Sequence, residues 1–164
     1  PGRMVLIHET RVQIPMGPQN SIMKRDYALY QVALKAMMKK NGRVLFLRLN
    51  ESKNPLDLPG GRIDNVEGKV PLEKILAREI QEELGNKIKY KLGRPLFQFR
   101  RYSPAQNTYN LLTVYDTKFI SGKIKLSSEH TSFVWINPKE YKFRPSDFFN
   151  KEEYLAFKKY FSRK

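Results

Sequence analysis

Apolar and polar positions near the start of the chain follow a pattern that predicts a β-hairpin. Two largely apolar runs, residues 27–38 (YALYQVALKAMM) and 43–49 (RVLFLRL), lie on either side of the pair Asn41-Gly42. Two such runs joined by Asn-Gly are typical of antiparallel strands connected by a tight turn. The Ala, Leu, Lys and Met residues of the first run would also suit a helix, but the turn signal favours two strands.

The helical pattern is clearest over residues 71–84. Apolar side chains recur there at helical spacing and form one stripe, made by Leu72, Ile75, Leu76, Ile80 and Leu84. Pro71 suits the first helical position, and Gly85 suits the left-handed residue that ends a helix. A second helix is predicted over residues 151–161, where an aromatic stripe on one side is typical of packing against a core.

The rest of the pattern indicates a mixed α/β domain. Further strands are predicted over residues 4–14, 88–92, 96–102, 109–119 and 133–136, the first of them at an edge of the sheet. Strands on both sides of a central helix, with a second helix at the end, are typical of this class. The chain has no internal repeat or Gly/Ser-rich linker, so we expect residues 1–164 to form a single domain. The pattern leaves the oligomeric state open.

The composition excludes several classes of function. The 164 residues contain no cysteine, which rules out a disulfide framework, a Cys-ligated zinc site and a thiol nucleophile. No apolar run approaches the roughly 20 residues that cross a bilayer, and the first residues lack the layout of a signal peptide. We therefore expect a cytoplasmic protein without a membrane partner.

The formal net charge of +15 is unusually high. A basic surface raises the local concentration of polyanions such as nucleotides, RNA or acidic lipid headgroups. The alternative is a lysine-rich surface that is merely solvated. The charge indicates what the protein attracts, but it names no reaction.

Three carboxylates on the predicted helix 71–84 point to a divalent cation. Glu79, Glu82 and Glu83 stand at positions i, i+3 and i+4, so they share one face. They repel one another, and the last two lie near the helix C-terminus, where the macrodipole disfavours negative charge. A bound cation would offset both effects, although acidic residues also solvate the outer faces of helices. Oxygen ligands without a nearby histidine favour Mg²⁺, with Mn²⁺ as a substitute, over zinc.

The residues before this helix and its three glutamates together form a longer motif. Pro59-Gly60-Gly61 makes a tight turn in which the backbone can approach a ligand closely. From there on, the chain resembles the Nudix box, G-x5-E-x7-R-E-U-x-E-E-x-G-U, where U is a bulky aliphatic residue. The motif is long and specific, and the chain matches it at Gly61, Glu67, Arg78, Glu79, Ile80, Glu82, Glu83 and Gly85.

Two features depart from the Nudix pattern. Ten residues instead of seven separate Glu67 from Arg78, so the loop before the helix is longer. The role of Glu67 is therefore open: Asp64 is an alternative, and a count backwards from the helix would reach Val70. Asn86 stands at the last aliphatic position, where it affects a packing contact and leaves the helix glutamates in place.

The resemblance to the Nudix family implies a fold and a set of site residues. The fold would be the Nudix α/β/α sandwich with a mixed central sheet. The implied metal ligands for Mg²⁺ are Glu79, Glu82, Glu83, Gly61 and Glu67. Arg78 would orient the glutamates through charge-assisted hydrogen bonds, and either Glu82 or Glu129 would act as the base that activates water.

Contacts to the substrate are expected from the glycine turn and from basic side chains. Gly60, Gly61 and Arg62 lie within the box or beside it. Arg100 is the further substrate contact that we predict, and Arg100 and Arg101 are the first basic side chains to test for phosphate binding.

The implied reaction is metal-dependent hydrolysis of a phosphoanhydride bond. Metal ions that bridge a diphosphate would neutralise its charge and activate a water molecule. The substrate would be a small nucleotide, a nucleoside diphosphate linked to another moiety. One alternative, motivated by the charge of +15, is a pyrophosphohydrolase or decapping activity at an RNA 5′ end. Another is a non-catalytic Nudix-like module that binds nucleotide or RNA.

Overall fold

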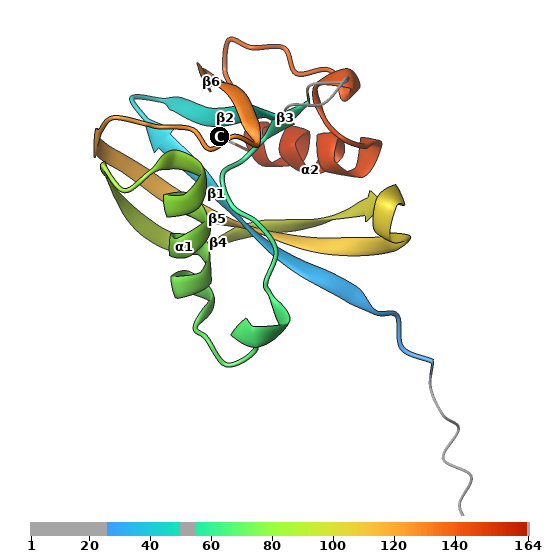
Figure 1. Ribbon diagram of the computed structural model, residues 1–164. Helices are drawn as coiled ribbons and strands as arrows, with labels where there is room; N and C mark the ends of the chain where they lie inside the picture. The colour runs from blue at the N-terminus through green and yellow to red at the C-terminus, as the bar shows by residue number, and fades with distance from the viewer. Residues whose placement is uncertain (1–25, 50–54, 164) are drawn as a thin grey trace, which may run out of the picture.

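The computed structural model describes residues 26–49 and 55–163, so the strand predicted over 4–14 lies outside the described residues. The strands form one sheet in the order β3-β2-β1-β5-β4, with β6 paired to β2 (Figure 1). Their bounds are β1 Tyr30–Lys40, β2 Arg43–Leu49, β3 Leu56–Asp57, β4 Ile88–Ser103, β5 Thr108–Gly122 and β6 His130–Ile136. The sheet is mixed, because β1 and β5 run parallel whereas the other pairs are antiparallel.

The predicted hairpin of β1 and β2 is confirmed. Asn41 and Gly42 both have positive φ, 49° and 75°, as a two-residue type I′ turn requires. Six consecutive residues of β1, from Ala33 to Met38, are buried. The good helix formers of this run lie in a strand because β1 is central in the sheet and covered on both faces, and this burial outweighs helix propensity.

The two strands predicted over 88–92 and 96–102 are in fact one strand, β4. Its register with β5 shifts between Leu92 and Pro95 and again between Pro95 and Phe97. Proline has no N–H to donate, and β4 lies at an edge of the sheet, where a bulge accommodates such a residue. Pairing on either side of the bulge makes one strand from a pattern that predicted two.

The two predicted helices cover opposite faces of the sheet, and the α/β/α sandwich is confirmed (Figure 1). They are α1, Leu72–Leu84, and α2, Lys151–Phe161. Side chains of a strand alternate between its faces, so Leu34 of β1 packs in the cluster with α1, whereas Met37 packs with Phe157 of α2. Within the described ranges, no helix is long and apolar enough to cross a membrane.

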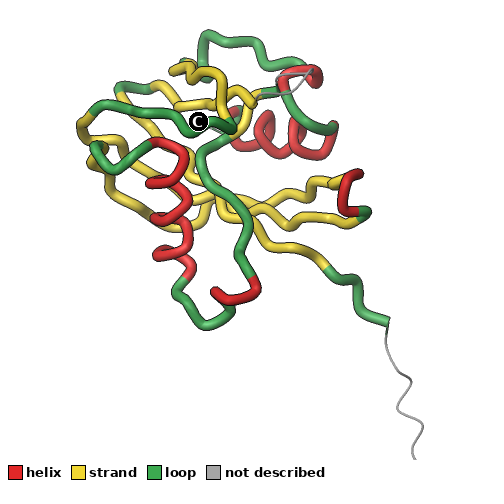
Figure 2. The backbone as a smooth tube through the Cα atoms, in the orientation of Figure 1, coloured by secondary structure: helices red, strands yellow, loops and turns green. Residues whose placement is uncertain are grey.

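The segment that follows β3 lies along β1 and carries the glycine turn (Figure 2). Away from the hairpin turn, the backbone of β1 bonds to this segment. Leu34 N donates to the Gly61 carbonyl at 2.9 Å, and Ala36 N donates to the Pro59 carbonyl at 2.7 Å. Gly60 and Gly61 are thereby fixed between the central strand and α1, which brings them to the helix glutamates.

Candidate active site

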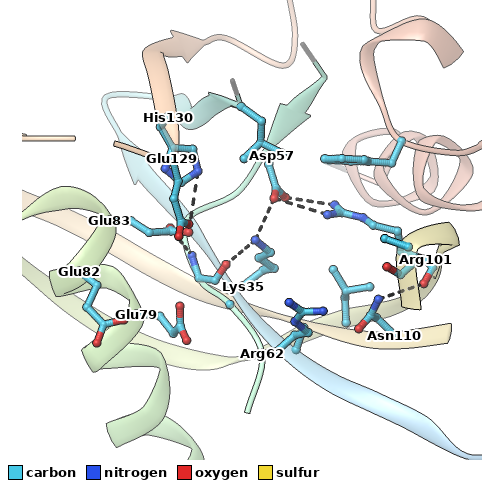
Figure 3. A pocket seen from close by; sticks show the side chains of 18 of the residues that line it. Lys35, Asp57, Arg62, Glu79, Glu82, Glu83, Arg101, Asn110, Glu129 and His130 are labelled. Atoms are coloured by element: carbon cyan, nitrogen blue, oxygen red, sulfur yellow. Dashed lines mark hydrogen bonds and ion pairs between the residues drawn. The ribbon is translucent and has the colours of Figure 1, made fainter. Parts of the chain in front are cut away.

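One pocket of about 650 Å³ brings together the glycine turn and the acidic face of α1. Figure 3 shows the glutamates of α1 on one side and a row of buried charged side chains on the other. The residues predicted from the sequence that line this pocket are Gly60, Gly61, Arg62, Asp64, Glu79, Glu82, Glu83, Arg101 and Glu129. These predicted residues come from four separate stretches of the chain and share one cavity.

Glu83 is the most deeply buried of the helix glutamates. Its residue is 8% exposed, and its Oε2 accepts a hydrogen bond from the Gly60 N–H at 2.7 Å. Burial raises the pKa of Glu83 to about 7, although the positive charge of Lys35 acts in the opposite direction. His130 Nε2 lies 3.8 Å from Glu83 Oε1, and burial lowers the pKa of this imidazole. Burial therefore disfavours the charged form of both groups.

Both glycines of the turn are required by their surroundings. Gly60 has a φ of 122°, and a Cβ on it would lie 2.2 Å from the Leu34 carbonyl oxygen. A Cβ on Gly61 would lie 2.1 Å from Glu79 Oε2. The absence of side chains therefore allows the turn to pack directly against β1 and against a carboxylate of α1.

Arg78 gathers three carboxylates around one guanidinium. It donates to Glu67 Oε1 and Oε2 at 2.7 and 2.9 Å, and it lies 2.9 Å from Glu79 Oε1 and 2.8 Å from Glu82 Oε2. The hydrogen bonds to Glu67 raise the pKa of Arg78 and lower that of Glu67. Burial raises the pKa of Glu79 despite the nearby arginine. Arg78 thus compensates the like charges that the sequence places on one helix face.

A second group of charges lies buried behind the turn. Lys35 Nζ is 2.9 Å from Asp57 Oδ2, and Arg101 Nη2 is 3.1 Å from Asp57 Oδ1 and 2.6 Å from Glu153 Oε1. Burial alone would raise the pKa of Asp57, but Arg101 and Lys35 together hold it well below its ordinary value. The guanidinium of Arg101 also stacks on Phe149, with its carbon 3.7 Å from the ring centroid. This network links β1, β3, β4 and α2 at the base of the pocket.

Three of the predicted site residues, Glu67, Arg78 and Arg100, do not line the pocket. Both carboxylate oxygens of Glu67 are held by Arg78, whereas Asp64 does line the cavity. Arg100 lies outside, where it pairs with Glu152 through two contacts of 3.0 Å. Neighbouring residues of a strand point to opposite faces, so Arg101 enters the pocket and Arg100 cannot.

The sequence pattern did not reveal Lys35, Asp57, Asn110 or Phe149 as pocket residues. A signal existed for the first of them: a lysine in the middle of an apolar strand is unusual and is buried only with a partner. The partner, Asp57, lies 22 positions away in the sequence. Only the folded chain shows that the two meet.

The donor chemistry of the pocket fits a hard divalent cation, which takes carboxylate oxygens as ligands. Glu79, Glu82 and Glu83 line the cavity together. Among the described residues, no three acidic or histidine side chains already converge at metal-ligand spacing, and Arg78 pairs with Glu79 Oε1 and Glu82 Oε2. Cation binding therefore requires the carboxylates to move closer together.

Comparison with known proteins places the chain by its structure. No protein-family model matches the sequence, and no curated protein sequence matches it either. The MutT protein of Methanosarcina mazei Go1 is similar with a TM-score of 0.62 and 23% identity, covering 85% of this chain and 95% of its own. A MutT Nudix hydrolase from Burkholderia pseudomallei is similar with a TM-score of 0.63 and 22% identity, and the similarity covers 79% of this chain and 97% of that protein.

A third similar structure is a UDP-X diphosphatase, with a TM-score of 0.60 and 20% identity, over 87% of this chain and 68% of its own. The similarity to these structures covers 79–87% of this chain, and it agrees with the resemblance to the Nudix box at Gly61 to Gly85. The chain therefore has the Nudix fold.

Proposed function

We propose that the chain hydrolyses, with the help of a divalent metal ion, a phosphoanhydride bond in a nucleoside diphosphate linked to another moiety. The observation that carries this proposal is the position of Glu79, Glu82 and Glu83 on the wall of one pocket, where Glu83 bonds to Gly60 and Glu79 lies against Gly61. A cavity of about 650 Å³ falls within the usual range for small-molecule sites.

Glu79, Glu82 and Glu83 would hold the ion, with Mg²⁺ as the expected cation and Mn²⁺ as its substitute. A bound divalent cation supplies neutralisation of the diphosphate and acidification of a coordinated water. Arg78 keeps two of the carboxylates in place before the ion binds, through contacts of 2.9 and 2.8 Å.

Phosphate binding and proton acceptance are assigned to other side chains that line the pocket. Arg62 follows the turn directly and donates to Gln31 Oε1 at 3.2 Å, so a phosphate could replace a neutral amide as its acceptor with a gain in electrostatic energy. Two exposed carboxylates that line the pocket, Glu82 and Glu129, are the candidates for the group that takes the proton of the attacking water. Each lies outside the most buried part of the site, where a proton can pass to solvent.

The structural neighbours support a small nucleotide as the substrate. One of them is a UDP-X diphosphatase, and another is an ADP-ribose pyrophosphatase from Streptococcus suis with a TM-score of 0.54 and 16% identity, over 83% of this chain and 94% of its own. Both of those proteins act on a nucleotide joined to a second group. We infer the same general class for this chain, without choosing the base or the second group.

The second candidate function is hydrolysis at an RNA 5′ end, and the observation that favours it is the net charge of +15. Binding that depends on many phosphate contacts weakens steeply as salt rises. An RNA substrate should therefore lose most of its turnover between low and physiological ionic strength, whereas a small nucleotide should lose much less.

The test is turnover with Mg²⁺ on a panel of nucleotide sugars, dinucleoside polyphosphates, nucleoside triphosphates and a 5′-triphosphorylated RNA. Glu83→Gln is assayed in parallel, and Glu73→Gln is the matched control, since Glu73 is an exposed glutamate in the first turn of the same helix. We expect one class to be hydrolysed by the wild type and by Glu73→Gln but not by Glu83→Gln. Silence across the panel, with nucleotide or RNA binding still measurable, would favour the non-catalytic module.

A further inference from the structure

Lys35 is a charged residue at the centre of the sheet. It is 6% exposed and belongs to the six consecutive buried residues of β1. Its ammonium group donates to Asp57 Oδ2 at 2.9 Å and to the carbonyl oxygen of Gly60. A buried ammonium needs such partners, and one of these two belongs to the glycine turn of the proposed site.

The backbone of Gly60 is held at both ends. Its carbonyl accepts from Lys35, and its N–H donates to Glu83 Oε2 at 2.7 Å. The residue cannot move away from β1 without losing these bonds, and a Cβ at this position would lie 2.2 Å from the Leu34 carbonyl oxygen. Lys35 and Glu83 are therefore linked through the backbone of Gly60.

The ammonium group of Lys35 is held in place by a network of buried charges. Its partner Asp57 lies 3.1 Å from Arg101 Nη2, and the same nitrogen lies 2.6 Å from Glu153 Oε1. The two carboxylates are almost completely buried, at 6% and 1% exposed. The ammonium group therefore has little freedom, and the position it imposes on Gly60 is well defined.

The charge of Lys35 does not by itself help a cation to bind nearby. A positive side chain beside the glutamates repels a second positive charge. An effect of Lys35 that favours the cation must therefore come from geometry, because its electrostatic effect has the opposite sign.

We propose that Lys35 is a positioning residue for the metal site: it holds the Gly60 backbone so that the Gly60 N–H orients the Glu83 carboxylate toward the cation. The inference rests on the proposed function in one respect, since it takes Glu83 as a metal ligand. Groups that orient a ligand without contacting the ion typically contribute roughly ten- to hundredfold to metal affinity.

The experiment is titration of the full chain with Mn²⁺, followed by electron paramagnetic resonance of the free ion, with no substrate present. The main variant is Lys35→Met combined with Asp57→Asn, which removes one positive and one negative charge and leaves the net charge unchanged. We expect its affinity for Mn²⁺ to fall roughly ten- to hundredfold. Thermal denaturation of each variant establishes that the protein titrated is folded.

Lys35→Met alone is the second variant, and its result has a diagnostic sign. Electrostatics predicts tighter binding once the lysine charge is gone, whereas loss of positioning predicts weaker binding. The matched control is Lys39→Met, because Lys39 lies on the same strand and is paired with a carboxylate, Asp116, at 2.5 Å. It does not contact the glycine turn, and we expect its Mn²⁺ affinity to equal that of the wild type.

Unchanged or tighter Mn²⁺ binding in either folded Lys35 variant would overturn the positioning role and leave the proposed function standing. Failure of the wild type to bind Mn²⁺ would overturn both. Weaker binding in both Lys35 variants, with Lys39→Met unaffected, would support the positioning role.

Discussion

The buried carboxylate of Glu83 makes a quantitative prediction about stability in the absence of metal. Its pKa is about 7 in the folded protein, compared with 4.5 for a free glutamate. The difference between these two pKa values corresponds to about 3 kcal/mol. The folded state binds the proton more tightly, and the free energy of unfolding therefore falls as pH rises from about 4.5 to about 7. Above about pH 7 the free energy of unfolding falls no further. Below about pH 4.5 the Glu83 carboxyl is neutral in both the folded and the unfolded protein, so its burial costs nothing.

Glu83→Gln removes this loss while leaving an oxygen that can accept from the Gly60 N–H. The neutral amide resembles the protonated carboxyl, so the gain is the full amount of about 3 kcal/mol at pH 8 and close to none at pH 4. For a chain of this size a gain of about 3 kcal/mol corresponds to a rise in Tm of roughly 6–12 °C.

The assay is thermal denaturation in EDTA at both pH values, with Glu73→Gln as the exposed control on the same helix. We expect Glu83→Gln to melt above the wild type at pH 8 and together with it at pH 4. A Tm difference that is the same at both pH values, or a lower Tm at pH 8, would refute the argument that the buried charge is unfavourable without a cation.

Two further predictions test the geometry of the site. Gly61→Ala places a methyl group where Glu79 Oε2 lies, 2.1 Å away, so we expect the carboxylate to be displaced and Mn²⁺ affinity to fall at least tenfold, as measured by titration. Arg101→Met leaves two buried carboxylates short of a countercharge and should lower the free energy of unfolding by about 3–5 kcal/mol, measured in urea. Arg100→Met removes an exposed ion pair and should cost at most about 1 kcal/mol; equal losses in the two arginine variants would contradict the assigned strand faces.

The elements that the sequence predicts correctly depend on consecutive residues, whereas the missed features depend on contacts between distant residues. Asn41-Gly42 and the apolar stripe of 71–84 were sufficient to predict the hairpin and α1, because turn conformation and helical spacing are properties of a few consecutive residues. The pattern predicts two strands, 88–92 and 96–102, with Pro95 between them, although an edge strand tolerates a proline through a bulge. Whether a strand lies at an edge depends on its neighbours, which the local pattern does not contain.

The same distinction holds for the candidate site. The spacing of Glu79, Glu82 and Glu83 put them on one helix face, and the Nudix box joined them to the glycine turn; both are local properties of the chain. Only the structure shows which face of β4 meets the pocket, and so that Arg101 lines it and Arg100 does not. It also shows that Asp64 lines the cavity, whereas Glu67 is bound by Arg78.

The sequence by itself therefore determined the hairpin, both helices and the acidic motif, since each depends on residues within one segment, and the resemblance of that motif to the Nudix box implied the sandwich. Only the tertiary structure decided that the segment after β3 lies along β1, and that Lys35 meets Asp57 and Gly60 there. The physical reason is that a buried charge is stable only beside a partner, and the partner's distance in sequence is set by the way the strands assemble.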